Sequence, residues 1–102
     1  MNVSDSRIYI GRLEEGRPAV YAVEAAAVER LDPAGEALGW GASAGDAALE
    51  LARTLLGDAS GSEPPADVCR LFAEQILRRV PRNGFVLQRD TVNAWLRRVV
   101  AV

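Results

Sequence analysis

The sequence from residue 7 to residue 24 reads Arg-Ile-Tyr-Ile-Gly-Arg-Leu-Glu-Glu-Gly-Arg-Pro-Ala-Val-Tyr-Ala-Val-Glu. Its two halves are rich in β-branched and aromatic residues, which favour strands, and a Glu-Glu-Gly-Arg segment typical of a hairpin turn separates them. A turn centred on Glu15 and Gly16 sets the register between the two strands. The pairs in this register are Arg7 with Glu24, Ile10 with Tyr21, and Glu14 with Arg17.

A third strand and a long loop are expected after this hairpin. Residues 28–31 keep the strand pattern, which ends at Asp32-Pro33 because proline cannot donate a ladder hydrogen bond. The alanine run at 25–27 also fits a helix, so both interpretations stay open for this part of the chain. From Pro33 to Ser43 the glycines around Trp40 predict a loop.

Helical periodicity predicts two helices after the loop. The first runs from Ala44 to Leu56, with Ser43 as its N-cap and Gly57 as its stop. A polar linker over 58–63 precedes the second helix, which runs from about Pro65 to Val80. Their apolar sides carry Ala48, Leu51, Ala52, Leu55 and Leu56 in the first, and Val68, Cys69, Phe72, Ala73, Ile76 and Val80 in the second.

A strand and a helix complete the pattern. Turn residues 81–84 lead into a strand at Phe85–Arg89, and Asp90 is the expected cap of a final helix with apolar positions at 92, 95, 96 and 99. The sequence therefore predicts one α+β domain over residues 1–102. In it a small, mainly antiparallel sheet of three to four strands is covered by about three helices, in the order β-β-(β)-α-α-β-α.

The composition excludes several kinds of catalysis. All 12 positive charges are arginines, and the chain contains no lysine and no histidine. It therefore lacks Ser-His and Cys-His pairs, histidine zinc sites, lysine Schiff bases and the Walker-type phosphate lysine. Two carboxylates can still act as acid and base, but the acidic residues fall in turns, caps and exposed helix positions. We therefore expect a protein that is not an enzyme and needs no cofactor or metal.

The cysteine and the N-terminal segment bear on the compartment. Cys69 falls on the apolar side of the second helix, which predicts a buried hydrophobic residue in preference to a reactive thiol. No basic segment followed by an apolar stretch opens the sequence, and no window holds the roughly 20 apolar residues of a membrane span. These features predict a cytoplasmic protein without membrane contact.

A loop with glycines at 39, 41 and 45 precedes the first predicted helix, and such loops bind phosphate in other folds. Here Asp46 already supplies a negative charge to the first turn, and Ser43 occupies a backbone donor. The spacing matches neither a P-loop nor a dinucleotide-binding motif. We therefore expect an ordinary capped loop whose Trp40 packs on the core.

The segment Trp40–Leu49, Trp-Gly-Ala-Ser-Ala-Gly-Asp-Ala-Ala-Leu, resembles the Trp-Gly-Tyr-Gly-Gly-Ser-Gly-Pro-Ala-x-Leu segment of the family called DUF6166. Phe72 corresponds to a mid-chain aromatic, residues 85–87 to a Trp-x-Leu strand, and Trp95-Leu96 to a closing Trp-Leu. Ala42 stands where the family has tyrosine, two loop glycines are missing, and an aspartate replaces the proline. The resemblance implies the same α+β fold and no chemistry, because the family has no assigned activity.

Charge is distributed unevenly along the chain. Residues 1–67 contain 5 arginines and 12 acidic residues, a net charge of −7, whereas residues 68–102 contain 7 arginines and 2 acidic residues, a net charge of +5. The two values add to the overall −2. Arg70, Glu74 and Arg78 follow the i, i+4 spacing of a solvated helix ladder, which explains part of the basic half without a function.

The candidate interaction residues lie in this basic half. They are Arg78, Arg79, Arg82, Arg89, Arg97 and Arg98. Their charges either mix with the acidic half on the folded surface, bind protein, or contact nucleic acid. The planar guanidinium favours protein interfaces, whereas a domain of net negative charge lacks the footprint of a general nucleic-acid binder. We therefore expect binding to a second copy or another protein, a homodimer included, with weak nucleic-acid association as the alternative.

Overall fold

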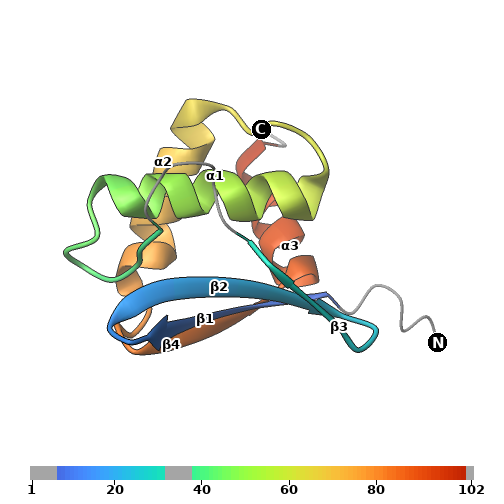
Figure 1. Cartoon of the computed structure of the whole chain (residues 1–102). Coiled ribbons are helices and arrows are strands. Elements are labelled where there is room, and N and C mark those ends of the chain that lie inside the picture. The colour runs from blue at the N-terminus through green and yellow to red at the C-terminus, as the bar shows by residue number, and fades with distance from the viewer. Residues whose placement is uncertain (1–6, 32–37, 101–102) are drawn as a thin grey trace.

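Four strands and three α-helices form the described part of the chain, residues 7–31 and 38–100 of a computed structural model (Figure 1). In chain order they are β1 (Ile8–Glu14), β2 (Arg17–Glu24), β3 (Ala27–Arg30), α1 (Asp46–Ser60), α2 (Ala66–Gln75), a short 3-10 helix η2 (Leu77–Arg79), β4 (Gly84–Gln88) and α3 (Arg89–Val100). The predicted α+β class and the order β-β-β-α-α-β-α are confirmed.

The strands form one antiparallel sheet in the order β3-β2-β1-β4. The hairpin register is the predicted one, because Ile10 pairs with Tyr21 and Glu14 with Arg17. The third strand is confirmed, and the helical alternative for the alanine run is wrong. Ala25 and Ala26 adopt positive φ values of 51° and 69° in the tight turn between β2 and β3. The predicted strand end at Asp32-Pro33 lies outside the described residues.

All three helices lie on one face of the sheet (Figure 1). Because side chains alternate along a strand, Tyr9, Val20 and Phe85 point into this interlayer space, where all are buried. The opposite face is covered by no element of residues 7–31 and 38–100. It carries the alternate side chains of the same strands, Ile8, Ile10, Tyr21, Val23, Val28 and Val86.

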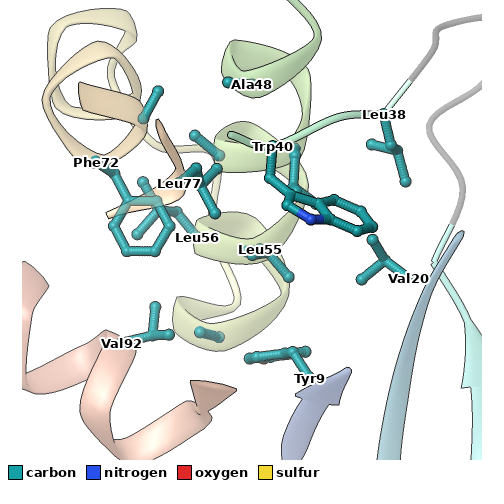
Figure 2. Packing of buried hydrophobic residues seen from close by; sticks show 14 of the residues in the cluster. Tyr9, Val20, Leu38, Trp40, Ala48, Leu55, Leu56, Phe72, Leu77 and Val92 are labelled. Atoms are coloured by element: carbon teal, nitrogen blue, oxygen red, sulfur yellow. The ribbon is translucent and has the colours of Figure 1, made fainter. Parts of the chain in front are cut away.

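The core lies between the sheet and the three helices, with α1 packed against α2 and α3, and α3 also against β4. Figure 2 shows Phe72 and Leu77 on one side of α1 and Trp40 with Val20 on the other. The five residues predicted for the buried side of the first helix are all fully buried: Ala48, Leu51, Ala52, Leu55 and Leu56. Cys69, Phe72, Trp40 and Trp95 are buried as predicted.

The glycine at position 11 of β1 leaves room for the side chain of Phe85 on β4. A Cβ atom built on Gly11 would lie 2.1 Å from Cε2 of Phe85, the residue opposite it in β4. The Phe85 ring thus fills the space that any other side chain would need. It also meets the Trp40 ring edge-on, with the two ring centroids 5.0 Å apart. The absence of a side chain at Gly11 therefore lets two aromatic rings pack over the sheet.

The predicted limits of the first helix are wrong at both ends. α1 begins at Asp46 after Gly45, and no side chain caps it, so Ser43 is not its N-cap. Gly57 does not end the helix, which continues to Ser60 and stops at Gly61, where φ is 78°. Asp58 is therefore part of the helix and not of a linker, and its contacts with the sheet stabilise this last turn.

The second helix is shorter than predicted. α2 ends at Gln75 and is followed by the 3-10 turn η2, in which Leu77 is fully buried. Arg78 thus leaves the regular helix, and the expected ladder from Arg70 to Arg78 does not form. The last helix begins at Arg89, which puts Asp90 in its first turn and not at the cap.

Two glycine substitutions test the packing of Phe85 on Gly11 and the continuity of α1 through Gly57. Gly11→Ala forces the Phe85 ring to move, so we expect a loss of about 2 kcal/mol or more in the free energy of unfolding. Gly57→Ala meets only ordinary contacts, the nearest atoms lying at 3.8 and 3.9 Å. Because Gly57 lies within a helix, this substitution should leave stability unchanged or raise it by about 0.5–1 kcal/mol. Urea unfolding of both variants measures the difference, and a destabilised Gly57→Ala variant would contradict the continuous helix.

Candidate functional site

A cluster of polar side chains joins the two layers at one end of the sheet. The Arg7 guanidinium binds the Asp58 carboxylate through two hydrogen bonds, with Nε donating to Oδ2 at 2.7 Å and Nη2 donating to Oδ1 at 2.9 Å. The Tyr9 hydroxyl donates to Oδ2 of Asp58 at 2.6 Å. Arg7 also pairs with Glu24 at 3.2 Å and with Glu29 at 3.0 Å. One arginine thus connects α1 to β2 and β3.

The helix α3 joins the same cluster. The Arg89 backbone N–H donates to the Arg7 carbonyl oxygen at 2.8 Å, and the Arg89 guanidinium lies 3.6 Å from Glu24. Only 13% of the Arg7 side chain is exposed, so its charge needs these carboxylates to offset the loss of water. The cluster therefore anchors the first residues of α3 to β1.

The pKa values in the cluster follow from burial and from these hydrogen bonds. Burial opposes ionisation of Asp58, but hydrogen bonds from Arg7 and Tyr9 outweigh it and lower the pKa of the carboxyl below its ordinary value. Burial and the hydrogen bond to Asp58 both raise the pKa of Tyr9. Asp58 is thus held ionised and Tyr9 neutral, which suits a fixed structural contact and leaves neither group ready to exchange a proton near neutral pH.

The six predicted interaction residues do not gather on one surface. Arg82 lies in the turn before β4, near Arg12, because Arg12 faces the first residue of β4. Arg89 follows the other end of β4 and belongs to the Arg7 cluster. Arg97 and Arg98 lie about two helical turns further along α3, roughly 12 Å from Arg89. The basic half of the sequence is therefore spread over three places in the fold.

Three of these arginines remain close together in residues 77–84, which we call the arginine turn. Arg79 and Arg82 are exposed, and Arg78 is half-buried with its Nε atom buried and without a hydrogen bond. Within residues 7–31 and 38–100, none of the three forms an ion pair. The turn thus presents guanidinium groups whose charge is not neutralised by the described part of the fold.

The Trp40 loop holds the arginine turn in place. The Trp40 indole N–H donates to the Arg82 carbonyl oxygen at 3.1 Å, and the Gly41 N–H donates to the Leu77 carbonyl oxygen at 2.8 Å. A cavity of about 230 Å³ opens beside this contact. Its lining includes Leu13 and Pro18 from the hairpin, Trp40 and Ser43 from the loop, and Arg82.

A second cavity, of about 440 Å³, lies beside Arg97. Pro64, Pro65, Leu96 and Val100 form most of its apolar wall, and Glu63 lies at its edge. The cavity beside the arginine turn shares none of these residues, so Arg97 and the turn belong to different parts of the surface. Arg97 and Arg98 are therefore matched controls for experiments on the turn.

Three further features of the described residues concern metal binding, the cysteine and membrane-spanning helices. In residues 7–31 and 38–100, no group of three or more Cys, Asp or Glu side chains is arranged to hold a metal ion. Cys69 is buried as predicted, and burial raises the pKa of its thiol. Over the same residues, no helix is long and apolar enough to span a membrane.

Sequence reasoning missed Asp58 and the role of Arg7. The hairpin register predicts the pair of Arg7 with Glu24, but the apparent helix stop at Gly57 places Asp58 in a linker. One available signal was the spacing from Leu51 and Leu55 to Asp58, which continues the buried face of the helix by i+7 and i+3. A carboxylate at such a position needs a cationic partner on the facing layer.

A family of unknown function (DUF6166) matches residues 4–98. The chain belongs to this family. Among curated proteins and among solved structures, no match was found.

The aromatic residues that resemble the DUF6166 pattern form two edge-on pairs in this DUF6166 protein. Trp40 meets Phe85, and Phe72 meets Trp95 with ring centroids 5.0 Å apart and an interplanar angle of 74°. The Trp95 indole N–H donates to Oε1 of Gln75 at 3.0 Å. These residues therefore support the core, and Trp40 also binds the arginine turn through its indole N–H.

The Asp58 cluster predicts a specific pH dependence of stability. Because the pKa of Asp58 is lower in the folded state than its ordinary 3.8, the ion pair stabilises the protein above that value. This stabilisation should disappear as the pH falls from about 5 through the folded-state pKa. At neutral pH, Asp58→Asn should lower the free energy of unfolding by about 1–3 kcal/mol. In acid, the difference in free energy of unfolding between the variant and the wild type should disappear.

Urea unfolding of the wild type and Asp58→Asn from neutral to acidic pH measures this gap. Glu50→Gln is the matched control, since Glu50 binds Arg53 on the exposed side of the same helix at 2.7 Å. It should change stability little at any pH. A gap for Asp58→Asn that is constant with pH would contradict the proposed ionic role.

Proposed function

We propose that this protein is a non-enzymatic, cytoplasmic interaction module that binds an acidic segment of another protein through the arginine turn. The observation that carries the proposal is the group of Arg78, Arg79 and Arg82, which have no ion-pair partner in residues 7–31 and 38–100. An arginine presents a planar fork of donors that fits a carboxylate. Acidic side chains are therefore the natural ligands of this turn.

The anchoring of the turn supports this proposal. Two hydrogen bonds connect its backbone to the Trp40 loop, at Leu77 and at Arg82. A backbone that is already ordered loses less conformational entropy on binding. The Arg82 cavity adds an apolar contact, because Trp40, Leu13 and Pro18 line it together with Arg82. An acidic segment with one small apolar side chain would use both features.

Arg89 is not part of the proposed surface, since Glu24 and the Arg7 carbonyl already bind it. Arg97 and Arg98 are separated from the turn by the length of α3. The alternative function is nucleic-acid association. A DNA or RNA chain would then have to contact all five of Arg78, Arg79, Arg82, Arg97 and Arg98. Nucleic-acid affinity depends on the number of phosphates contacted, and this separation favours a local protein ligand.

A titration followed by NMR tests the proposal. The probe is a short polyglutamate peptide at low salt, and the reporters are the two indole N–H signals of Trp40 and Trp95. The Trp40 signal should shift because its partner is the Arg82 carbonyl. The Trp95 signal should shift less, because its partner is the Gln75 side chain, which lies outside the arginine turn. The proposal is contradicted if neither indole signal shifts. It is also contradicted if the backbone amide signals of all exposed arginines shift equally.

Paired charge reversals give the specificity control. Arg79→Glu with Arg82→Glu should weaken peptide binding about tenfold or more, whereas Arg97→Glu with Arg98→Glu changes the net charge equally and should retain most of it. A single-stranded oligonucleotide of equal charge serves as the second probe. The nucleic-acid alternative is supported instead if the protein binds the oligonucleotide but not the peptide, and if both double variants weaken oligonucleotide binding equally.

A further inference from the structure

The cavity beside Arg97 lies between the loop that joins α1 to α2 and the last turn of α3, which pass close to each other in Figure 1. The loop contributes Pro64 and Pro65 to its lining, and α3 contributes Leu96 and Val100. Its volume is about 440 Å³. Sites for small molecules are mostly apolar hollows of about 300–1,000 Å³. The cavity therefore has the size and the wall of a site for a small apolar ligand.

Several polar groups on the loop side of this cavity are already hydrogen-bonded within the fold. The Ser60 hydroxyl donates to the Leu56 carbonyl oxygen at 2.7 Å and accepts from the Ser62 N–H at 3.3 Å. The Pro65 carbonyl oxygen accepts from the Cys69 N–H at 3.1 Å. Proline also has no N–H to donate. Fewer groups are left to bind the amides of a peptide, which favours a plain apolar chain as the ligand.

Arg97 brings a positive charge to the edge of the cavity. It is exposed, and within residues 7–31 and 38–100 it forms no ion pair. Glu63 also lines the cavity, but its Oε1 lies 3.8 Å from Nη1 of Arg53, and 77% of its side chain is exposed. The Glu63 carboxylate is thus directed to another arginine and to water. The Arg97 guanidinium is left to bind an anionic group of the ligand, and its planar fork of donors fits a carboxylate.

We propose that this cavity binds a medium-chain fatty carboxylate, with the alkyl chain against Pro64, Pro65 and Leu96 and the carboxylate at Arg97. A methylene group occupies about the same volume as a water molecule in the liquid, about 30 Å³. The ten heavy atoms of octanoate therefore fit within the cavity. Removal of the methylene groups from water supplies the affinity. The carboxylate sets the direction of the chain, because the positive charge lies on the α3 side.

Titration with butyrate, hexanoate and octanoate, followed by NMR of the protein, tests the apolar part of the proposal. The amide signals of Ser62, Leu96 and Val100 should shift. The affinity should rise about twofold to fourfold for each added methylene, where the upper value corresponds to full burial and the lower one to a chain that water still reaches on one side. An affinity that does not change with chain length indicates an ionic contact alone and overturns the proposal.

A comparison of Arg97 with Arg98 tests the carboxylate contact. Arg97→Gln should weaken octanoate binding about threefold to fivefold, the range for an exposed ion pair, and should leave the binding of uncharged 1-octanol unchanged. Arg98→Gln is the matched control, because it removes the same charge from a neighbouring residue outside the lining of the cavity. Both side chains are exposed, so both variants should keep the wild-type melting curve. Equal weakening of octanoate binding by the two variants overturns the proposal.

Intermolecular NOE measurements identify the occupant of the cavity. The methylene protons of octanoate should contact the methyl groups of Leu96 and Val100. Acetyl-glycyl-leucine is the peptide probe, since its leucine places as many carbons behind the carboxylate as hexanoate does. Tighter binding of this peptide than of hexanoate overturns the proposal. Contacts between residues 101–102 and Leu96 that octanoate does not displace overturn it as well, because the chain itself then fills the cavity.

This inference does not depend on the proposed function. The variant with Arg79→Glu and Arg82→Glu should bind octanoate like the wild type, and Arg97→Gln should bind the polyglutamate peptide like the wild type. The Trp40 indole signal should stay unchanged during the octanoate titration, because it reports on the Arg82 carbonyl. Loss of octanoate binding in the Arg79 and Arg82 double variant, together with a shift of the Trp40 signal in the wild type, would locate octanoate at the arginine turn and overturn the cavity proposal.

Discussion

The ion pair between Arg7 and Asp58 is the contact on which the arrangement of the two layers depends. A largely buried guanidinium destabilises the fold unless carboxylates surround it, and three elements each supply one. This requirement aligns the end of α1 with the start of β1 and brings the β2–β3 turn to the same point. Because the Arg7 carbonyl also binds the Arg89 N–H, the start of α3 is positioned by the same residue.

The opposite end of the sheet is organised by apolar contacts. Gly11 has no side chain, so Phe85 fills its place and the Trp40 ring packs on Phe85. Trp40 uses its remaining polar atom to hold the Arg82 carbonyl. The position of the arginine turn thus results from packing in the core, whereas its charges contribute nothing to that packing. A surface built in this way can change its ligand without loss of the fold.

Local patterns determined what could be predicted from sequence. The hairpin register followed from the turn at Glu15-Gly16 and from the pairing of unlike charges, and the buried faces of the helices followed from their period. The error at Gly57 has a tertiary cause, since the contacts of Asp58 with Arg7 and Tyr9 outweigh the local stop signal. The error at Ser43 is local, because the helix begins three residues later, after Gly45. The candidate site was limited in the same way: residues adjacent in sequence, such as Arg78 to Arg82, stay together, whereas the position of Arg97 relative to them depends on long-range topology.

The unequal charge of the two halves can now be related to the fold. Of the 7 arginines in residues 68–102, Arg89 pairs with an acid of the first half, and within the described residues the other six form no ion pair. The acidic half instead binds Arg7 and stabilises the junction of the layers. The positive charge of the second half therefore stays at the surface. It is most fixed in the arginine turn, because the Trp40 loop binds the backbone of that turn at Leu77 and at Arg82. A ligand that binds there meets charged groups on a backbone that the core already holds in place, so little conformational entropy is lost on binding.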